Sequence, residues 1–453
     1  MATYVRDFTA LISDAHTWNG AVGQGIATKP VFLTYSFATA KPPVDPAINY
    51  ADPNYFRTLS NQERATFTEA IAIWGAASGI TFFEAPGGMG DVEVGAYALS
   101  GNTAGMGSYP HSSYYTANGA NQLYAPSNRY AGIWLDHETG MSMHVMLHEI
   151  GHRLGLQHPH DGGDPLLAPD LDNGANTVMS YKDHFPRLGT FDIQAIQALY
   201  GTNEQDARQV ANWDWNPATF TLTQQGTTGS ETFNGTAAHD VIHTGGGADL
   251  VVARGGNDVI HVNGSNFKIS AGSGFDVVYI ALARGDLRGH VQNGDYTYLT
   301  AKGAQASTMY VFEAERLVLT DAVLALDLDG KAGQAYRLYE AAFDRVPDQA
   351  GLGYWIRELD AGKGSLTWMA NNFILSEEFK ARYGSPEAVS NTAFLDLLYR
   401  NVLSRGADGE GFNYWMGRME SGFGRDAVLA SFSESTENKA NVAGAITDGI
   451  WYI

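Results

Sequence analysis

The sequence predicts a multidomain protein: an α+β domain over residues 1–205, a periodic β domain over 206–330 and a small α-helical domain over 331–453. Three observations support this prediction. A chain of 453 residues is too long for one ordinary core, strand and helix patterns alternate in its first part, and two internal repeats of different period follow. Because hydrophobic residues make up 44% of the chain, disorder throughout is excluded.

The composition limits the partners and the cellular location that we expect for this protein. A net charge of −21 repels phosphate groups, so we expect no nucleic-acid partner, whereas cation binding fits this charge. No apolar run approaches roughly 18 residues, so we expect no transmembrane segment. The absence of cysteine excludes disulfides and thiolate metal ligands. The N-terminal residues lack a basic region followed by an apolar core, so we expect either a cytoplasmic protein or export without an N-terminal signal.

The first part of the chain alternates strand and helix patterns. Aliphatic and aromatic runs over 31–37 and 80–83 predict two strands. Apolar residues recur at helical spacing over 61–77, 141–154 and 191–200, which predicts three helices.

The strongest chemical signal is the stretch His148-Glu-Ile-Gly-His152-Arg-Leu-Gly155-Leu-Gln-His158. His148 and His152 are one helical turn apart, so both imidazoles can reach one ion. Gly155 can take the left-handed conformation that ends the helix and lets His158 approach from another direction. Three imidazoles with an open fourth position predict one catalytic zinc ion, with another divalent metal as the alternative. Glu149 lies beside the first ligand, where it can take a proton from metal-bound water.

The residues around this motif have a plainer interpretation. An amphipathic helix with scattered histidines is the alternative to a metal site, but apolar residues already supply its buried face. His144 lies one turn before His148, and we expect it to be structural, because a fourth imidazole would close the open site. Six loop residues are expected to be solvated, with calcium binding by some of the acids as the alternative: His160, His184, Asp161, Asp164, Asp170 and Asp172.

The motif resembles that of a known protein family. The stretch 148–158 resembles the metzincin metalloproteases, in which a methionine turn lies below the metal, and Thr-Val-Met-Ser-Tyr at 177–181 looks like that turn. Together with the sequence of 191–201 and a nine-residue repeat described below, these features resemble the serralysins, secreted bacterial proteases. The resemblance implies a metzincin-like catalytic domain, a zinc metalloendopeptidase activity and polypeptide substrates.

The resemblance also implies roles for single residues. The three histidines of the motif would bind zinc, and Glu149 would be the general base that later donates a proton to the leaving amine. Met179 would form a hydrophobic floor under the metal without a bond to it. Tyr181 would ligate zinc at rest and swing away to stabilise the tetrahedral oxyanion. Without the resemblance, Met179 is interpreted as a core residue and Tyr181 as a packed aromatic.

A nine-residue repeat runs through residues 226–279. Asp240, Asp249, Asp258 and Asp276 share its register, with glycines before each acid in most copies and aliphatic pairs after it. Glycine permits tight turns and the aliphatic residues form short strands. The pattern matches the RTX repeat, whose turns bind calcium through carboxylate and carbonyl oxygens.

The resemblance to the RTX parallel β-roll implies how these acids are arranged. One coil takes two nonapeptides, so residues eighteen apart stack on one edge. Asp240, Asp258 and Asp276 would form one edge, where we predict two calcium ions. The other edge would contain Asp249 but is damaged, because Phe267 cannot bind a cation. The alternative is glycine-rich turns without metal.

The RTX pattern bears on localisation. RTX proteins resemble one another in leaving the cell unfolded through type I secretion with an uncleaved C-terminal signal, and the acid-plus-apolar end at 448–453 looks like such a signal. We therefore expect the type I secretion machinery as a partner and an extracellular location. Folding would then wait for external calcium, because binding energy is folding energy when the site does not pre-exist.

A second repeat, with a period of about 60 residues, begins near residue 331. Its recurring residues are Tyr339, Arg345, Asp348, Gly351, Tyr354, Trp355 and Gly362 in the first copy and Tyr399, Arg405, Asp408, Gly411, Tyr414, Trp415 and Gly422 in the second. Its helical periodicity predicts a small helical pair. The repeats resemble a family of unknown function in bacterial exoproteins. Their Tyr-Trp pairs predict either a glycan or cell-surface contact or plain packing anchors.

Two functions from different classes remain. The first is a secreted zinc-dependent endopeptidase stabilised by calcium. The second is a surface-layer or extracellular matrix-binding protein whose protease domain serves processing only. A purely adhesive form is expected to lose Glu149 or a histidine of the motif. All four residues are present, which favours the enzyme.

Overall fold

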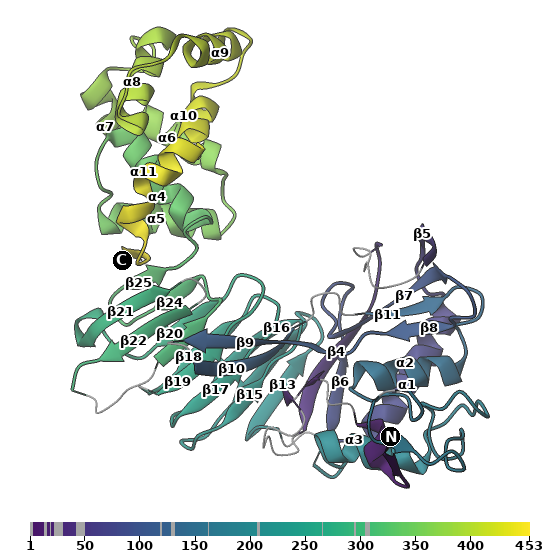
Figure 1. The fold of residues 1–453 in the computed structure, drawn as a ribbon. Coiled ribbons are helices and arrows are strands. Elements are labelled where there is room, and N and C mark those ends of the chain that lie inside the picture. The colour runs from purple at the N-terminus through teal and green to yellow at the C-terminus, as the bar shows by residue number, and fades with distance from the viewer. Residues whose placement is uncertain are drawn as a thin grey trace. The chain divides into compact units, whose positions relative to one another are not determined.

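The computed structural model describes two compact units (Figure 1), named here unit 1 (residues 1–277 and 304–313) and unit 2 (278–303 and 314–453). Each unit is treated by itself. The residues described are 3–12, 16–18, 20–21, 30–41, 50–117, 120–127, 132–161, 163–205, 209–264, 266–293, 296–303 and 309–453. The chain therefore has the multidomain character that its length and repeats predict.

A mixed sheet organises the first part of unit 1. Its strands are β4 (Val31–Phe37), β5 (Tyr50–Arg57), β6 (Ile80–Glu84), β7 (Val92–Leu99), β8 (Gly105–Gly107) and β11 (Ile133–Asp136). They are ordered β6-β4-β7-β11-β8, with β5 paired to β7. The first four strands of this order are parallel, whereas β8 is antiparallel to β11 and forms an edge. Strand β4 is buried along its whole length, which agrees with its largely apolar sequence, interrupted only by Thr34 and Ser36.

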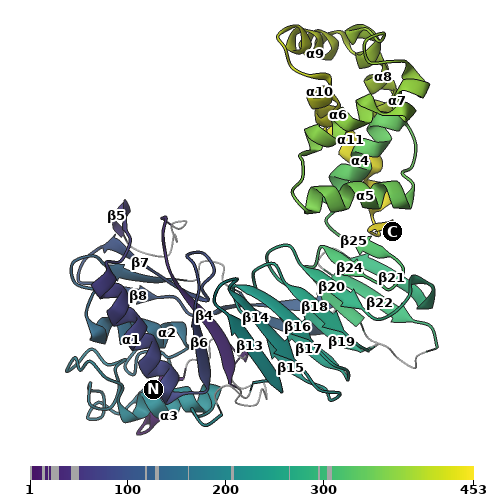
Figure 2. The same cartoon turned by 180° about the vertical axis from the view of Figure 1, so that it is seen from behind.

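Three helices accompany this sheet, as the periodicity predicts: α1 (Asn61–Ala77), α2 (Met143–Arg153) and α3 (Thr190–Tyr200). Helix α1 begins with a capping box in which Ser60 and Glu63 satisfy each other's backbone N–H groups. The side chain of Ser142 caps α2 by accepting a hydrogen bond from the backbone of Val145. Figure 2 shows α1 and α2 beside the sheet. The indole of Trp74 in α1 donates to the carbonyl of Leu147, so α1 braces α2 from within the core.

The remaining short elements of this region lie near the chain start and in two hairpins. They are β1 (Tyr4–Val5), the 3-10 helix η1 (Phe8–Leu11), β2 (His16–Thr17), β3 (Gly20–Ala21), β9 (His111–Ala117), β10 (Ala120–Ser127) and β12 (Leu166–Leu167). Strand β1 pairs in parallel with β12, and the pairs β2–β3 and β9–β10 are antiparallel.

The nine-residue repeat and the strands on either side of it form two sets of mostly parallel strands in unit 1. One set contains β13 (Asn212–Asn216), β14 (Thr221–Gln225), β16 (His239–His243) and β18 (Val259–Val262), and the other contains β15 (Thr232–Asn234), β17 (Asp249–Val252), β19 (Phe267–Ser270) and β23 (Met309–Phe312). Only β13 runs antiparallel to its neighbour. From β14 to β19 the chain alternates between the two sets, and residues eighteen apart pair, such as Ile242 with Ile260. The ring of Phe267 is buried opposite Asp249.

The strands of unit 2 are β20 (Val277–Ile280), which begins at the boundary, β21 (Leu287–Asn293), β22 (Tyr296–Ala301), β24 (Arg316–Val318), β25 (Val323–Ala325) and β26 (Ile450–Tyr452), with a short 3-10 helix η2 (Arg284–Asp286). Strands β24, β25 and β26 pair antiparallel in this order. The apolar end of the chain is therefore a β-strand, with Ile450 and Tyr452 buried.

Residues 331–446 form more helices than the predicted small helical pair, so that prediction was wrong. The helices are α4 (Lys331–Phe343), α5 (Gln349–Asp360), α6 (Leu366–Leu375), α7 (Glu377–Tyr383), α8 (Asn391–Leu403), α9 (Gly409–Glu420), α10 (Arg425–Ser433) and α11 (Thr436–Ile446). They share one apolar core. The periodicity predicts helices but not where one helix ends and the next begins. These boundaries are set by short capping positions, such as Ser376, which ends α6 and caps the start of α7.

The recurring residues of this region are largely explained by packing. In each copy the hydroxyl of Tyr339 or Tyr399 approaches a glycine so closely that a Cβ there would lie 2.5 or 2.4 Å from it. The indoles of Trp355 and Trp415 pack against the common core. Tyr354 and Tyr414 are 50% and 57% exposed, so only these tyrosines of the Tyr-Trp pairs present a largely open ring. Among the described residues no helix is long and apolar enough to cross a membrane.

Candidate metal centre

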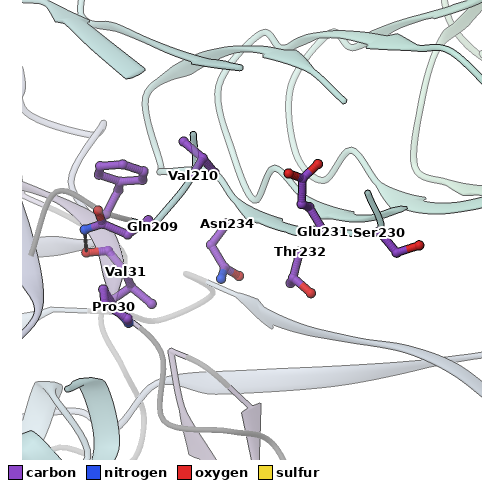
Figure 3. A pocket seen from close by; sticks show the side chains of 9 residues that line it. Pro30, Val31, Gln209, Val210, Ser230, Glu231, Thr232 and Asn234 are labelled. Atoms are coloured by element: carbon purple, nitrogen blue, oxygen red, sulfur yellow. Dashed lines mark hydrogen bonds between the residues drawn. The ribbon is translucent and has the colours of Figure 1, made fainter. Parts of the chain in front are cut away.

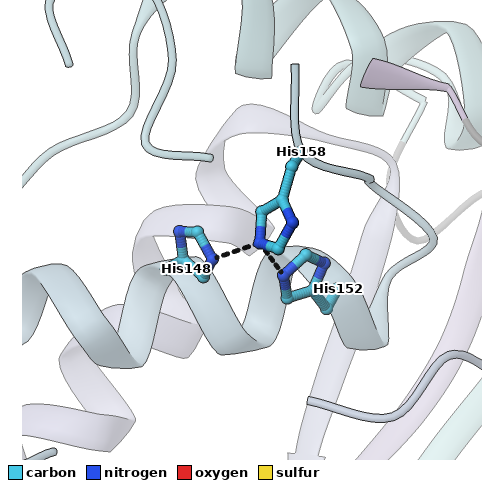
Figure 4. Close-up of side chains that lie close together, drawn as sticks. All are labelled: His148, His152 and His158. Atoms are coloured by element: carbon cyan, nitrogen blue, oxygen red, sulfur yellow. Dashed lines mark hydrogen bonds between the residues drawn. The ribbon is translucent and has the colours of Figure 1, made fainter. Parts of the chain in front are cut away.

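Three histidines of unit 1 converge on one point (Figure 4). His148 and His152 lie on the same face of α2, and Gly155, with φ of +101°, turns the chain so that His158 returns towards them. The Nε2 atom of His158 lies 3.1 Å from Nε2 of His148 and 3.0 Å from Nε2 of His152. One nitrogen of each ring lies within 4.8 Å of the others, so the three side chains can hold one metal ion.

The opposite nitrogen of each ring has its own acceptor. Nδ1 of His148 lies 2.9 Å from the carbonyl oxygen of Val178, and Nδ1 of His152 lies 2.8 Å from that of Leu156. Nδ1 of His158 lies 2.9 Å from a carboxylate oxygen of Asp161. These acceptors favour the tautomer with a proton on Nδ1, which leaves the Nε2 lone pairs directed into the cluster.

Burial keeps these rings neutral. It lowers the pKa of His148 to about 3 and that of His152 well below its ordinary value, with smaller effects from the neighbouring imidazoles. Burial also lowers the pKa of His158, against the opposing effect of Asp161. Neutral imidazoles are the form that binds zinc, so the donor set fits this ion.

Glu149 is buried beside the histidines and carries a perturbed carboxyl group. Burial raises its pKa to about 8, against the opposing effect of a hydrogen bond from the backbone of Gly107. A Cβ on Gly105 would lie 2.7 Å from Cγ of Glu149, so the edge strand β8 approaches the glutamate closely only because glycine stands there. A nearby cation would favour the charged form again.

Met179 packs directly against the helix that carries two of the histidines. It is fully buried, and a Cβ on Gly151 would lie only 2.6 Å from its sulfur. The glycine between the glutamate and the second histidine therefore makes room for the thioether. Sequence reasoning gave Gly151 no role.

A buried carboxylate orders the turn that contains Met179. Asp192 on α3 accepts hydrogen bonds from the hydroxyl of Thr177 (2.6 Å) and from the backbone N–H groups of Val178 and Gly189 (both 2.7 Å). Burial raises its pKa to about 6. The sequence offers one signal for the role of Asp192, which is an acid on the apolar side of a predicted helix.

Two tyrosines border the histidines. The hydroxyl of Tyr181 lies 2.9 Å from Nε2 of His158, and its side chain is 58% exposed. Partial burial raises the pKa of Tyr181. Tyr109, which sequence reasoning missed, lies with its hydroxyl 3.4 Å from Nδ1 of His152. Nothing in the local sequence around Tyr109 marks it, because Tyr109, which follows β8, is far from α2 in the chain.

The neighbouring loop residues have varied environments. The ring of His144 stacks on that of His184 at 4.5 Å, and its Nδ1 lies 3.1 Å from the carbonyl of Phe185, so it takes a packing role away from the three Nε2 atoms. His160 is half-buried, with its ring 5.5 Å from that of His158.

The acids of these loops are not all solvated. Asp172 is buried, accepts a hydrogen bond from the hydroxyl of Ser180 and pairs with Lys182 at 3.0 Å, so the expectation of a solvated Asp172 was wrong. Both contacts come from the end of the turn that contains Met179 or from the residue after it. The other loop acids are exposed, although each has a partner: Asp161 with His158, Asp164 with the backbone of Thr3 and Asp170 with Arg6.

The acids of the nine-residue repeat form a buried column in unit 1. Asp240, Asp258 and Asp276 are fully buried and lie in successive turns. A carboxylate oxygen of Asp258 accepts the backbone N–H of Asp240, and one of Asp276 accepts that of Asp258, both at 2.8 Å. Asp249 accepts the backbone N–H of Glu231 at 3.0 Å.

A pocket of about 310 Å³ lies elsewhere in unit 1 (Figure 3). Its lining combines Val31 and its neighbours with Gln209, Val210 and the segment 230–234. The amide of Gln209 donates to the carbonyl of Val31 in its wall. None of the three histidines lines this pocket.

Comparison with known proteins agrees with this geometry. Residues 46–201 match the family model described as Matrixin, and residues 225–260 match the RTX calcium-binding nonapeptide repeat. The resemblance to the serralysin-type metzincins with RTX repeats is confirmed. Residues 370–442 match a domain of unknown function, DUF4214.

The curated relatives that the chain resembles are proteases by name. The chain is 28% identical over 218 residues to metallopeptidase AprA of Pseudomonas marginalis, covering 43% of this chain and 44% of the relative. It is 29% identical over 211 residues to serralysin G of Dickeya chrysanthemi, covering 41% and 42%. It is 25% identical over 167 residues to matrix metalloproteinase-C of Caenorhabditis elegans, covering 34% and 28%. The chain thus covers less than half the length of these relatives.

Proposed function

We propose that this chain is a secreted, zinc-dependent endopeptidase that hydrolyses peptide bonds in polypeptide substrates. One observation carries the proposal: three Nε2 atoms converge beside the buried carboxyl group of Glu149, and every Nδ1 has an acceptor. This combination supplies ligands and a proton acceptor for hydrolysis. The serralysin and AprA relatives support the same class of reaction.

Each residue of the site would have a separate role in the reaction. His148, His152 and His158 would hold zinc, which would act as a Lewis acid and lower the pKa of water to about 7. Glu149 would accept a proton from the attacking water and donate it to the leaving amine nitrogen. The hydroxyl of Tyr181, which faces His158, would move towards the developing oxyanion and donate a hydrogen bond to it.

Other groups would hold this machinery in place. Met179 would form an apolar floor below the ligands, where it packs on Gly151. The edge strand β8 leaves backbone groups for an extended polypeptide, because it has a partner on one side only in the described sheet. These roles need no movement of the helix that carries two of the ligands.

We further propose that the repeat is a calcium-binding parallel β-roll and that Asp240, Asp258 and Asp276 bind calcium on one edge, with Asp249 on the other. Burial raises the pKa of Asp240 to about 7 and that of Asp258 well above its ordinary value. One carboxylate oxygen of each of these two acids is buried without a hydrogen-bond partner among the described residues. A divalent cation would compensate both acids.

The remaining proposals concern organisation and location. We propose functional regions at 1–205, 206–330 and 331–453, export by a type I secretion system and folding outside the cell. The net charge of −21 and the RTX family match support this location. The exposed Tyr354 and Tyr414 are the candidate points of contact with a cell surface or glycan. A purely adhesive protein with a processing domain is the weaker alternative, because the complete constellation of ligands and Glu149 serves no adhesive purpose.

The proposed function is tested by casein hydrolysis with the purified chain in calcium. The expected result is activity that a zinc-selective chelator removes and added zinc restores. Glu149→Gln should bind zinc with unchanged stoichiometry but lose about a hundredfold or more of the activity. No hydrolysis by the zinc-loaded, calcium-loaded chain would contradict the proposal and direct attention to the repeats at 331–453.

A further inference from the structure

Arg254 occupies a position of the repeat at which two other copies have glycine. The position four residues before the acid is Gly245 in one copy and Gly272 in another, with φ of +80° and +102°. In the copy that ends at Asp258 this position is Arg254, with φ of +77°. Left-handed backbone is unfavourable for a residue with a Cβ. Contacts of the Arg254 side chain outside the turn have to compensate for this conformation.

The side chain of Arg254 leaves the repeat and enters the core of the peptidase region. Its Nη1 donates to a carboxylate oxygen of Asp91 at 2.8 Å, and its Nη2 donates to the carbonyl of Phe32 at 3.1 Å. Both charged side chains are almost completely buried. The guanidinium also lies 4.9 Å from the centre of the Trp18 ring.

Asp91 and Trp18 also contact the end of helix α2. Arg153, the residue after His152, donates from Nε and Nη2 to the backbone carbonyl of Asp91, at 3.1 and 2.8 Å. Its guanidinium lies 4.6 Å from the centre of the Trp18 ring, and the indole of Trp18 donates to the carbonyl of Arg153 at 3.1 Å. Arg254 and Arg153 thus share Asp91 and Trp18. A shift of Arg254 would therefore disturb the contacts of Arg153, which is the residue next to the proposed zinc ligand His152.

Asp91 also contacts the adjacent turn of the repeat. Its second carboxylate oxygen accepts the backbone N–H groups of Thr34, at 2.8 Å, and Ala237, at 3.3 Å. The turn that contains Ala237 leads to Asp240. In the same turn, the carbonyl of Thr236 accepts a hydrogen bond from the N–H of Gly255 at 3.2 Å. Two turns on the edge of the buried acids therefore meet the end of α2 at one residue, Asp91, the turns at its carboxylate and α2 at its backbone carbonyl.

We propose that Arg254 is a positioning residue, through which calcium loading of the turn at 253–258 sets the geometry of the zinc site. This inference rests on the proposed function, since it takes the buried acids as calcium ligands and the histidines as zinc ligands. Without calcium, the uncompensated burial of Asp240 and Asp258 loosens both turns. Arg254 then leaves Asp91, and the end of α2 loses the support that fixes Arg153 and, with it, His152.

The test is Arg254→Gly in the full chain. Glycine suits the left-handed backbone, so this variant removes the guanidinium and relaxes the turn. We expect calcium affinity to be retained, while zinc affinity falls about tenfold or more, as for other residues that orient metal ligands. At saturating zinc, kcat should fall and KM should change little. The visible spectrum of the cobalt-substituted chain should change, because the direction of a ligand changes.

Three further variants keep the test decisive. Ser404→Gly relaxes another left-handed residue, in unit 2, and should leave every parameter unchanged. The double variant Arg254→Gly with Asp91→Asn removes the buried carboxylate that Arg254→Gly leaves unpaired. If Arg254→Gly alone fails to fold, the double variant replaces it in the test and should show the loss of zinc affinity expected for Arg254→Gly. Arg254→Lys restores the charge without the planar fork and should rescue zinc affinity in part.

The opposite results are equally clear. Unchanged zinc affinity and an unchanged cobalt spectrum in Arg254→Gly would overturn the proposal, and so would a loss of calcium affinity, because Arg254 would then act inside its own turn. If the original chain binds both metals but cleaves no peptide, the endopeptidase proposal fails. Zinc affinity and the cobalt spectrum still decide the role of Arg254 in that case.

Discussion

The carboxylate of Asp192 accepts the backbone N–H of Val178 at 2.7 Å, and the carbonyl of Val178 lies 2.9 Å from Nδ1 of His148. The backbone of one residue, Val178, thus connects a buried acid on α3 to a candidate zinc ligand on α2. We predict that Asp192→Ala lowers the free energy of unfolding by about 3 kcal/mol, because several buried donors lose their acceptor. Zinc affinity should fall as well. Urea unfolding and a zinc competition assay measure both effects.

The control for this variant is Asp170→Ala. Asp170 pairs with Arg6 at the surface, where both side chains are more than half exposed. Its removal should cost less than about 1 kcal/mol. Equal destabilisation by the two variants would contradict the ordering role of Asp192.

Asp161→Asn tests the carboxylate that orients the third histidine. The amide cannot replace the charge that faces Nδ1 of His158 at 2.9 Å. We predict a loss of zinc affinity of about ten- to a hundredfold with little change in stability, since Asp161 is exposed. Zinc titration against a fluorescent chelator measures this change. Asp170→Asn, an exposed acid without a histidine partner, should bind zinc like the unchanged chain.

Tyr181→Phe tests the proposed oxyanion donor. The phenyl ring keeps the contacts of Tyr181 with the neighbouring rings but removes the hydroxyl that lies 2.9 Å from His158. We predict that zinc remains bound and that kcat for a peptide substrate falls about a hundredfold, with a small change in KM. Tyr4→Phe, which alters an exposed tyrosine, is the control. Full activity in Tyr181→Phe would exclude the role.

Gly151→Ala tests the packing of Met179 on α2. The added Cβ would lie 2.6 Å from the sulfur of Met179. We predict a net destabilisation of about 1–3 kcal/mol despite the better helix propensity of alanine. The matched control is Gly444→Ala in α11, where an added Cβ meets no atom within 4 Å. That change should stabilise the chain by up to about 1 kcal/mol. Thermal unfolding of both variants shows whether the two signs differ as expected.

The stability of the zinc-free chain should depend on pH through His148. Its pKa is about 3 in the folded chain and near the ordinary 6.5 after unfolding. Between these values the unfolded chain binds a proton at this ring and the folded chain does not, so the free energy of unfolding decreases as the pH falls from 6.5 towards 3. Denaturation with a chelator present measures the slope. His148→Phe should flatten it, and an equal slope in this variant would assign the effect to other groups.

Some of this molecule follows from local sequence alone. The pairing of the candidate ligands His148 and His152 is predictable because residues four apart share a helix face, whatever surrounds the helix. The strand at 31–37 and the helix at 61–77 follow from an apolar run and an apolar period in the same way. The nine-residue register of Asp240 and Asp258 is also visible in the sequence, since it repeats a turn and a short strand.

The tertiary structure decided what lies between these local elements. It brought Asp192 to the methionine turn, Asp161 to His158 and Arg254 to Asp91, and it buried Asp172, which we had expected to be solvated. It also split the C-terminal repeats into eight helices. Side chains far apart in sequence meet only when packing fixes both backbones, and their residue types alone do not specify a partner. The sequence therefore determined which groups can do the chemistry, whereas only the packed chain decided which groups hold them in position.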